Sequence, residues 1–111
     1  MSIGFPPNLI RPDFRIKYTQ VQVTVTASRI IGESPDRVAL IWFPVSIGDY
    51  FVAPYPHMTI GNGIKCNFAA APIIIDYGTW GAITGDSWYG AVAAVPTTIT
   101  VGEIIYSPKR S

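Results

Sequence analysis

Charged side chains are scarce in this sequence. Asp, Glu, Lys and Arg make up 14% of its 111 residues, against roughly a quarter in an ordinary soluble domain. The formal net charge is only +1, and the basic residues are scattered along the chain, which excludes a basic nucleic-acid-binding stripe. The sequence has one cysteine, Cys66, which excludes a disulfide within the chain and a zinc site built from several cysteines.

Long apolar runs are missing as well. The longest stretch without a charged side chain, residues 87–102, contains Gly90 and Pro96, so we expect no membrane-spanning helix. Residues 1–15 contain three prolines and Asp13 where a signal peptide would need an apolar segment. We therefore expect a protein that is made in a cytoplasm without a cleaved leader.

The sequence is instead rich in apolar residues and in turn formers. Hydrophobic residues make up 49% of the chain, the mean hydropathy is +0.31, and there are 10 glycines and 10 prolines. A domain of this size buries only about two-thirds of the surface that its unfolded chain exposes. We therefore expect apolar surface that stays exposed or is covered by a partner. The glycines and prolines disfavour long helices, and the composition excludes a coiled coil.

The spacing of apolar residues predicts short β-strands. Residues 20–27 alternate between valine or alanine and polar side chains, which is the period of a half-buried strand. Residues 38–43 form a continuous apolar run, typical of a strand covered on both faces, and Trp42 within this run is expected in the core. Gly102 suggests a bulge in the last strand. Further strand-like segments are residues 50–52, 57–60, 65–68, 73–75, 87–95 and 98–106.

These segments and the turns between them predict an all-β fold, namely a single-domain β-sandwich or jelly roll over residues 14–111. Residues 1–13 are predicted to form an extended, proline-rich N-terminal arm. Its side chains are too apolar for a free tail, so we expect the arm to contact a neighbouring subunit. The candidate interface residues here are the arm residues Ile3, Phe5, Leu9 and Ile10, with Arg11 and Arg15 at the root.

The residues that could support catalysis or metal binding are few. The only histidine, His57, could in principle pair with Cys66 across a hairpin, but a loop histidine and a small buried thiol explain these residues better. Ca²⁺ could be held by Asp49, Asp76 and Asp86, although no calcium-loop motif is present. We therefore expect no enzyme and predict no catalytic, cofactor or metal site.

The loop aromatics remain as candidates for binding. Tyr77 and Trp80 lie among glycines, and Trp88 and Tyr89 follow a few residues later. Aromatic residues of this kind anchor protein interfaces, and we predict that role for Tyr77 and Trp80. The alternative is a carbohydrate- or receptor-binding sandwich in which Trp80, Trp88 and Tyr89 hold sugar rings.

Three motifs resemble a pattern in small structural proteins of tailed bacteriophages. These are the turn and strand of residues 34–41 (SPDRVALI), the loop and strand of residues 84–93 (TGDSWYGAVA) and the final strand residues 100–103 (TVGE). The resemblance covers roughly residues 31–106. It implies a virion component of the capsid decoration or cement type, with a neck or tail protein as an alternative.

The resemblance also implies partners and a location. It predicts binding to the major capsid protein or other virion subunits, assembly as a homotrimer, and no direct contact with nucleic acid or membrane. The protein would be part of the virion after assembly in the host cytoplasm. In that interpretation, the arm and the loop aromatics stabilise the shell through repeated small contacts.

Overall fold

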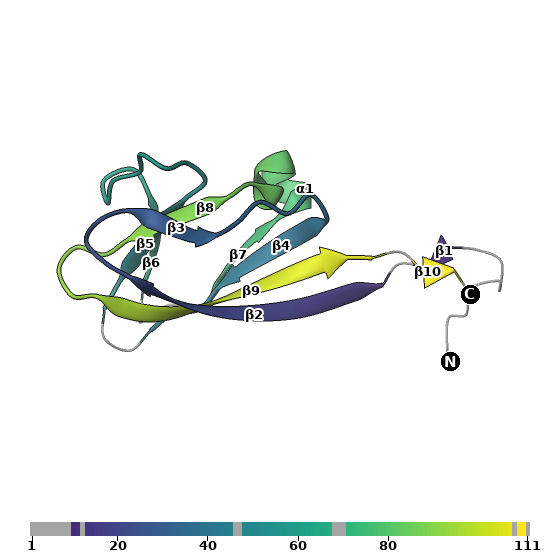
Figure 1. Cartoon of the computed structure of the whole chain (residues 1–111), viewed down its shortest axis with the longest axis horizontal. Coiled ribbons are helices and arrows are strands. Elements are labelled where there is room, and N and C mark those ends of the chain that lie inside the picture. Colours follow the sequence, from purple (N-terminus) through teal and green to yellow (C-terminus); the bar gives the residue numbers. More distant parts are fainter. Residues whose placement is uncertain (1–9, 12, 46–47, 68–70, 108, 111) are drawn as a thin grey trace.

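The computed structural model describes residues 10–11, 13–45, 48–67, 71–107 and 109–110, and these residues form mainly β-strands (Figure 1). No helix within this part of the chain is long and apolar enough to cross a membrane. The elements are β1 (Ile10–Arg11), β2 (Phe14–Val23), β3 (Ser28–Ile31), β4 (Arg37–Trp42), β5 (Tyr50–Ala53), β6 (Ile64–Cys66), β7 (Ile73–Asp76), α1 (Tyr77–Trp80), η1 (Gly81–Gly85), β8 (Trp88–Ala91), β9 (Thr97–Tyr106) and β10 (Lys109–Arg110).

The main strands form two four-stranded antiparallel sheets packed face to face (Figure 1). One sheet has the order β2-β9-β4-β7 and the other the order β3-β8-β5-β6. Successive strands cross repeatedly from one sheet to the other, which is the connectivity of an eight-stranded jelly roll. The predicted all-β sandwich is therefore confirmed.

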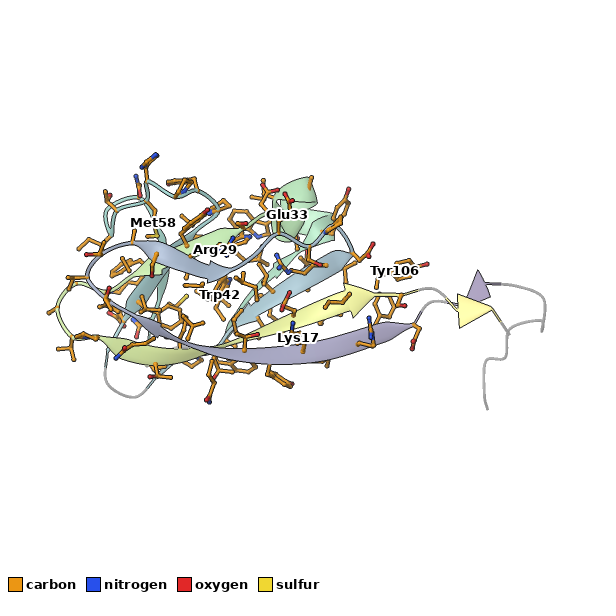
Figure 2. The ribbon with its side chains drawn as sticks, viewed as in Figure 1. Lys17, Arg29, Glu33, Trp42, Met58 and Tyr106 are labelled. Atoms are coloured by element: carbon orange, nitrogen blue, oxygen red, sulfur yellow. The ribbon has the colours of Figure 1, made fainter. Side chains whose placement is uncertain are left out.

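Large apolar side chains fill the space between the sheets. Trp42 on β4 and Trp88 on β8 are fully buried, and their ring centroids lie 5.8 Å apart; Figure 2 shows Trp42 between the two sheets. The indole N–H of Trp88 donates a hydrogen bond to the carbonyl of Ile83 at 3.0 Å. The two rings come from different sheets and pack against each other, so their burial stabilises the contact between the sheets. The prediction that Trp42 lies in the core is confirmed.

The two longest strands, β2 and β9, form a ribbon that continues past the sandwich. They pair residue by residue from Phe14 opposite Tyr106 to Val23 opposite Thr97. Beyond them the amide of Ser107 donates to the carbonyl of Asp13 at 2.7 Å, and β1 pairs with β10. In Figure 1, β1 and β10 lie beyond one end of the sheets.

Several predicted strand limits are wrong. Residues 20–27 were expected to be one strand, but β2 begins at Phe14 and ends at Val23. Its pairing with β9 stops there, the Thr24 hydroxyl oxygen accepts a hydrogen bond from the Thr26 amide, and Val25 is 58% exposed. The predicted strand 57–60 is a turn region, because Met58 folds back against the sheet that contains β5.

Two local features also differ from expectation. No bulge occurs at Gly102, and the irregularity in pairing lies between Arg37 and Ala39 on β4. A Cβ atom at Gly102 would lie 3.3 Å from the ring of Tyr18 and 3.4 Å from that of Phe43, so this glycine makes room for two rings. The list of expected strands contained no helix, and the structure adds two short ones, α1 and η1; the Asp76 carboxylate accepts from the Thr79 amide at 2.7 Å and caps α1.

Candidate functional site

The outer surface of the β2-β9-β4-β7 sheet is apolar where a sheet in water is normally polar. On β2, the side chains of Phe14, Ile16 and Tyr18 are 54%, 55% and 60% exposed. The strand period of two places them on the side opposite to the buried Val23. Large exposed apolar side chains in one row are uncommon on a monomeric protein, so this row is the first candidate for a functional surface.

The pairing register extends this row across the sheet. Ile16 lies opposite Ile104 on β9, and Ile104 lies opposite Ala39 on β4. In the next row, Gly102 lies between Tyr18 and Ile41. We call this surface the outer apolar face; its large members are Phe14, Ile16, Tyr18, Ile41, Phe43, Ile74, Ile104 and Tyr106.

Two aromatic pairs strengthen the outer apolar face. The rings of Phe14 and Tyr106 have centroids 5.5 Å apart, and those of Tyr18 and Phe43 are 6.1 Å apart, both in tilted geometry. Figure 2 shows Tyr106 at the end of β9 from which the chain continues toward β10. Tilted ring pairs at these distances attract each other, so these contacts favour the observed ring positions on the outer apolar face.

A buried ion pair joins β4 to β9 near the same end of the sheet, because Arg37 lies opposite Ile105, the neighbour of Tyr106. Arg37 on β4 and Glu103 on β9 are only 1% and 4% exposed, and the Arg37 Nε lies 2.9 Å from the Glu103 Oε2. The same guanidinium donates to the carbonyls of Gly32, Thr84 and Asp86. This network connects two strands, the loop after β3 and the segment around η1. Its role is structural, because its donors are directed at fixed backbone acceptors.

A hollow of about 440 Å³ lies beside this ion pair, between β2 and the loop after β3. Its charged lining residues are Lys17, Glu33, Arg37 and Glu103. The lining contains neither His57 nor Cys66, so the two residues considered as a catalytic pair do not meet in this hollow.

The structure does not support a reactive His57–Cys66 pair. His57 is exposed in the turn region after β5, whereas Cys66 on β6 is buried. Burial raises the pKa of the Cys66 thiol to about 12, and hydrogen bonding with Tyr50 only partly opposes this rise. Burial also raises the pKa of Tyr50, whose hydroxyl donates to the carbonyl of Phe43 at 2.6 Å. Cys66 is therefore a protonated, buried thiol at neutral pH, as the simpler interpretation of the sequence held.

The calcium and sugar alternatives also lose their geometric basis. Among the described residues, which include Asp49, Asp76 and Asp86, no three acidic, histidine or cysteine side chains are grouped so that they could hold a metal ion. Trp88 is fully buried against Trp42, so it offers no face to a sugar ring. The predicted platform of Trp80, Trp88 and Tyr89 is therefore wrong.

The predicted interface residues lie in different parts of the fold. Tyr77 and Trp80 are exposed on α1, and Arg15 lies on β2 opposite Ile105 of β9. The backbone of Ile10 and Arg11 forms β1 and pairs with β10. Ile3, Phe5 and Leu9 are outside the described residues. The interface role of these eight residues stays a prediction, as does the division into an arm of residues 1–13 and a sandwich of residues 14–111.

Comparison with known proteins adds one finding about the fold. No family model and no curated protein matches the sequence. Among solved structures, the chain matches a protein of Bacillus endospore appendages, which form disulfide-linked pili, with a TM-score of 0.55 and 11% identity; the match covers 96% of each chain. The chain is similar in fold to a pilus protein. At this identity the similarity concerns the fold alone.

This finding corrects the resemblance to bacteriophage proteins, which is wrong. The chain matches an appendage protein over almost its full length, and the expectations that depended on the resemblance fall with it. These are a capsid decoration, neck or tail role, a location in the virion, a capsid partner and a homotrimer on a shell. The carbohydrate- or receptor-binding alternative depended on the loop aromatics, and it is contradicted by the same match and by the buried position of Trp88.

The motifs that carried the bacteriophage resemblance have a structural explanation within this chain. The amide of Ser34 donates to the carbonyl of Gly85 at 2.8 Å. Arg37 binds the carbonyls of Thr84 and Asp86 as well as the carboxylate of Glu103. The three motifs thus meet in one hydrogen-bonding network within the sandwich. Such a network stabilises the fold and does not indicate a role in a virion.

Sequence reasoning missed the outer apolar face and the buried ion pair. A signal for the face exists in residues 14–18, where apolar and basic side chains alternate, and this pattern predicts a strand. A signal for the ion pair is Glu103, a lone acid within an otherwise uncharged strand from Thr97 to Tyr106. An acid in such a place needs a partner when it is buried.

Proposed function

We propose that this chain is a structural, non-enzymatic subunit that polymerises with copies of itself into a pilus-type appendage on the surface of an endospore. The observation that carries the proposal is the fold similarity to a pilus protein over 96% of both chains. Because the match extends over nearly the full length of both proteins, they share a complete subunit architecture and not merely a hairpin or a single sheet.

The surface of the chain supports self-association. Phe14, Ile16 and Tyr18 are each more than half exposed, and only 14% of the residues are charged. A surface of this kind is poorly suited to a permanently solvated monomer. Polymerisation removes such surface from water at a gain of about 25 cal/mol for each Å² of apolar area.

The single cysteine determines how such a polymer is held together. A polymer linked by disulfides from subunit to subunit needs at least two cysteines in each chain, because one cysteine can join only a pair. This sequence has Cys66 alone, and that thiol is buried. Contacts between subunits of this chain are therefore non-covalent, in contrast to the disulfide-linked pili of the similar protein.

Electron microscopy of the purified protein tests the proposal. Negatively stained samples from a concentration series, prepared with and without a reducing agent, should contain fibres of constant width in both conditions. Sedimentation velocity on the same samples should show mass increasing with concentration. A chain that stays monomeric and forms no fibres at any concentration would overturn the proposed function.

A further inference from the structure

The outer surfaces of the two sheets differ in how far other residues of the chain cover them. On the β3-β8-β5-β6 sheet, Met58 from the turn region after β5 packs with Ala53 and Ala91 and is only 4% exposed. Figure 2 shows Met58 above this sheet, in the loop that folds over it. The chain thus covers part of this apolar outer surface with its own residues.

The outer apolar face of the β2-β9-β4-β7 sheet has no such cover among the described residues. Phe14, Ile16 and Tyr18 on β2 and Ile74 on β7 are all more than half exposed, although the register joins them in one sheet. A chain that covers one outer surface and leaves the other open has one side suited to a partner.

The charges on this face favour a second copy of the same chain as that partner. In the four strands, the positions that point outward carry one charged side chain, Asp76, which lies at the edge and caps α1. Two identical faces can therefore pack together without like charges meeting at the centre. The polar outward positions Gln20, Gln22, Thr98 and Thr100 lie at the far ends of β2 and β9, where they can form a polar rim.

We propose that the outer apolar face binds the same face of a second copy, so that two sandwiches pack back to back around a two-fold axis. This inference rests on the proposed function, because it names one of the contacts between subunits of the polymer. Sheets that pack face to face lie about 10 Å apart with interleaved side chains, and the ring pairs of Phe14 with Tyr106 and Tyr18 with Phe43 provide such side chains.

The size of the face is sufficient for this contact. At about 3.4 Å for each residue and about 4.8 Å between strands, the four strands present roughly 500 Å² in projection. Two copies together therefore bury roughly 1,000 Å², which is near the lower limit for a specific protein interface. An interface of this size is suited to a contact that is repeated many times in a polymer, where multivalency adds to its strength.

A pair of matched variants tests the proposal. Ile16→Asp places a charge on the outer apolar face, on the edge strand β2, and Val25→Asp places one in the loop between β2 and β3. The two side chains have nearly equal exposure, 55% and 58%, so both variants should fold like the wild type by circular dichroism and tryptophan fluorescence. In sedimentation equilibrium, Ile16→Asp should weaken dimer formation by about tenfold or more, because it buries an unpaired charge. Val25→Asp should leave dimer formation unchanged.

Crosslinking adds a test that does not depend on a disruptive substitution. In the Ile16→Cys variant, one of a series of bis-maleimides should produce a covalent dimer; the series starts at a spacer of about 10 Å, the distance between packed sheets, and extends to longer spacers because Ile16 lies on the edge strand β2. The Val25→Cys variant should not, and the wild type should not react because Cys66 is buried.

The outcomes separate this inference from the proposed function. If the wild type forms fibres and a folded Ile16→Asp variant forms the same dimers and fibres, the face is not an interface between copies and the proposed function stands. If the wild type forms dimers that Ile16→Asp abolishes but never forms fibres, the face is confirmed and the polymer is not. A wild type that stays monomeric, with no crosslinked Ile16→Cys dimer, overturns both.

Discussion

Cys66 shows how burial decides the chemistry of a single residue. A free cysteine has a pKa of about 8.5, whereas burial raises the pKa of Cys66 to about 12. The thiolate is the reactive form, and the folded chain therefore holds almost none of it at neutral pH. The thiol is a small, buried group of the core.

The reactivity of Cys66 should therefore depend on unfolding. At pH 8, we expect a disulfide reagent such as Ellman's reagent to modify the native chain at least ~100-fold more slowly than the chain in urea. Between pH 7 and 9 the native rate should stay low, because the pKa of Cys66 lies above this range. The Val25→Cys variant serves as the control, since its thiol would be exposed and outside the proposed interface and should react at once. Immediate modification of the native wild type would contradict the buried position of Cys66.

The Arg37–Glu103 pair should dominate the electrostatic stability of the fold. Arg37→Met leaves the Glu103 carboxylate buried without its partner, which typically costs 3–5 kcal/mol, about the stability of many small domains. The matched control is Lys65→Met, which removes the exposed ion pair with Asp49 at 3.2 Å and should cost no more than about 1 kcal/mol. Urea denaturation followed by tryptophan fluorescence measures both changes. If both variants lose the same small amount of unfolding free energy, the contacts of Arg37 with Glu103 and the three carbonyls stabilise the fold no more than an exposed ion pair does.

At the scale of elements, η1 depends on close contact with the turn after β3. A Cβ atom at Gly85 would lie 2.7 Å from the carbonyl oxygen of Ser34, and the Ser34 amide donates to Gly85. Neither backbone group can rotate away as a flexible side chain could. This contact fixes the position from which Thr84 and Asp86 accept hydrogen bonds from Arg37.

Gly85→Ala should therefore destabilise the fold by about 1–3 kcal/mol, since the added methyl group forces backbone segments apart. Gly32→Ala is the matched control, because a Cβ atom there would have nothing within 4 Å. Urea denaturation midpoints of the two variants provide the comparison. If both midpoints equal that of the wild type, the contact between η1 and the turn is not required for stability.

At the scale of the whole molecule, assembly should be independent of disulfides. Cys66→Ala changes a buried side chain but removes the only thiol of the chain. We expect this variant to form the same fibres as the wild type, and we expect wild-type fibres to persist in a reducing agent. Electron microscopy of both samples decides the matter. Fibres that dissolve on reduction, or that Cys66→Ala cannot form, would show that this thiol links subunits after all.

The extent to which the sequence predicted this molecule varies with the feature. Trp42 was placed correctly, because a continuous apolar run allows no other position than the core. The course of β2 was misjudged for a physical reason: its apolar side chains change phase between Tyr18 and Val21. The strand passes through this change without a bulge, so its first half is apolar on the outside and its second half on the inside.

The ion pair could not have been predicted in full. Arg37 and Glu103 are far apart in the sequence, and only the pairing of β4 with β9 brings them together. A turn such as residues 34–36 and a lone acid in a strand are common in unrelated β-sandwiches. For the same reason, the three motifs around this network resembled bacteriophage proteins without indicating a relationship.

The fold class can be predicted from the sequence alone, because the alternation of apolar residues and the frequent glycines and prolines favour short strands and turns. The sequence also shows that disulfides between copies of this chain cannot form a polymer, because a single cysteine can join only two chains. Which apolar side chains are buried and which are exposed becomes clear only in the folded chain. That depends on strand register and on what covers each sheet, and here Met58 covers one outer surface while Phe14, Ile16 and Tyr18 stay exposed on the other.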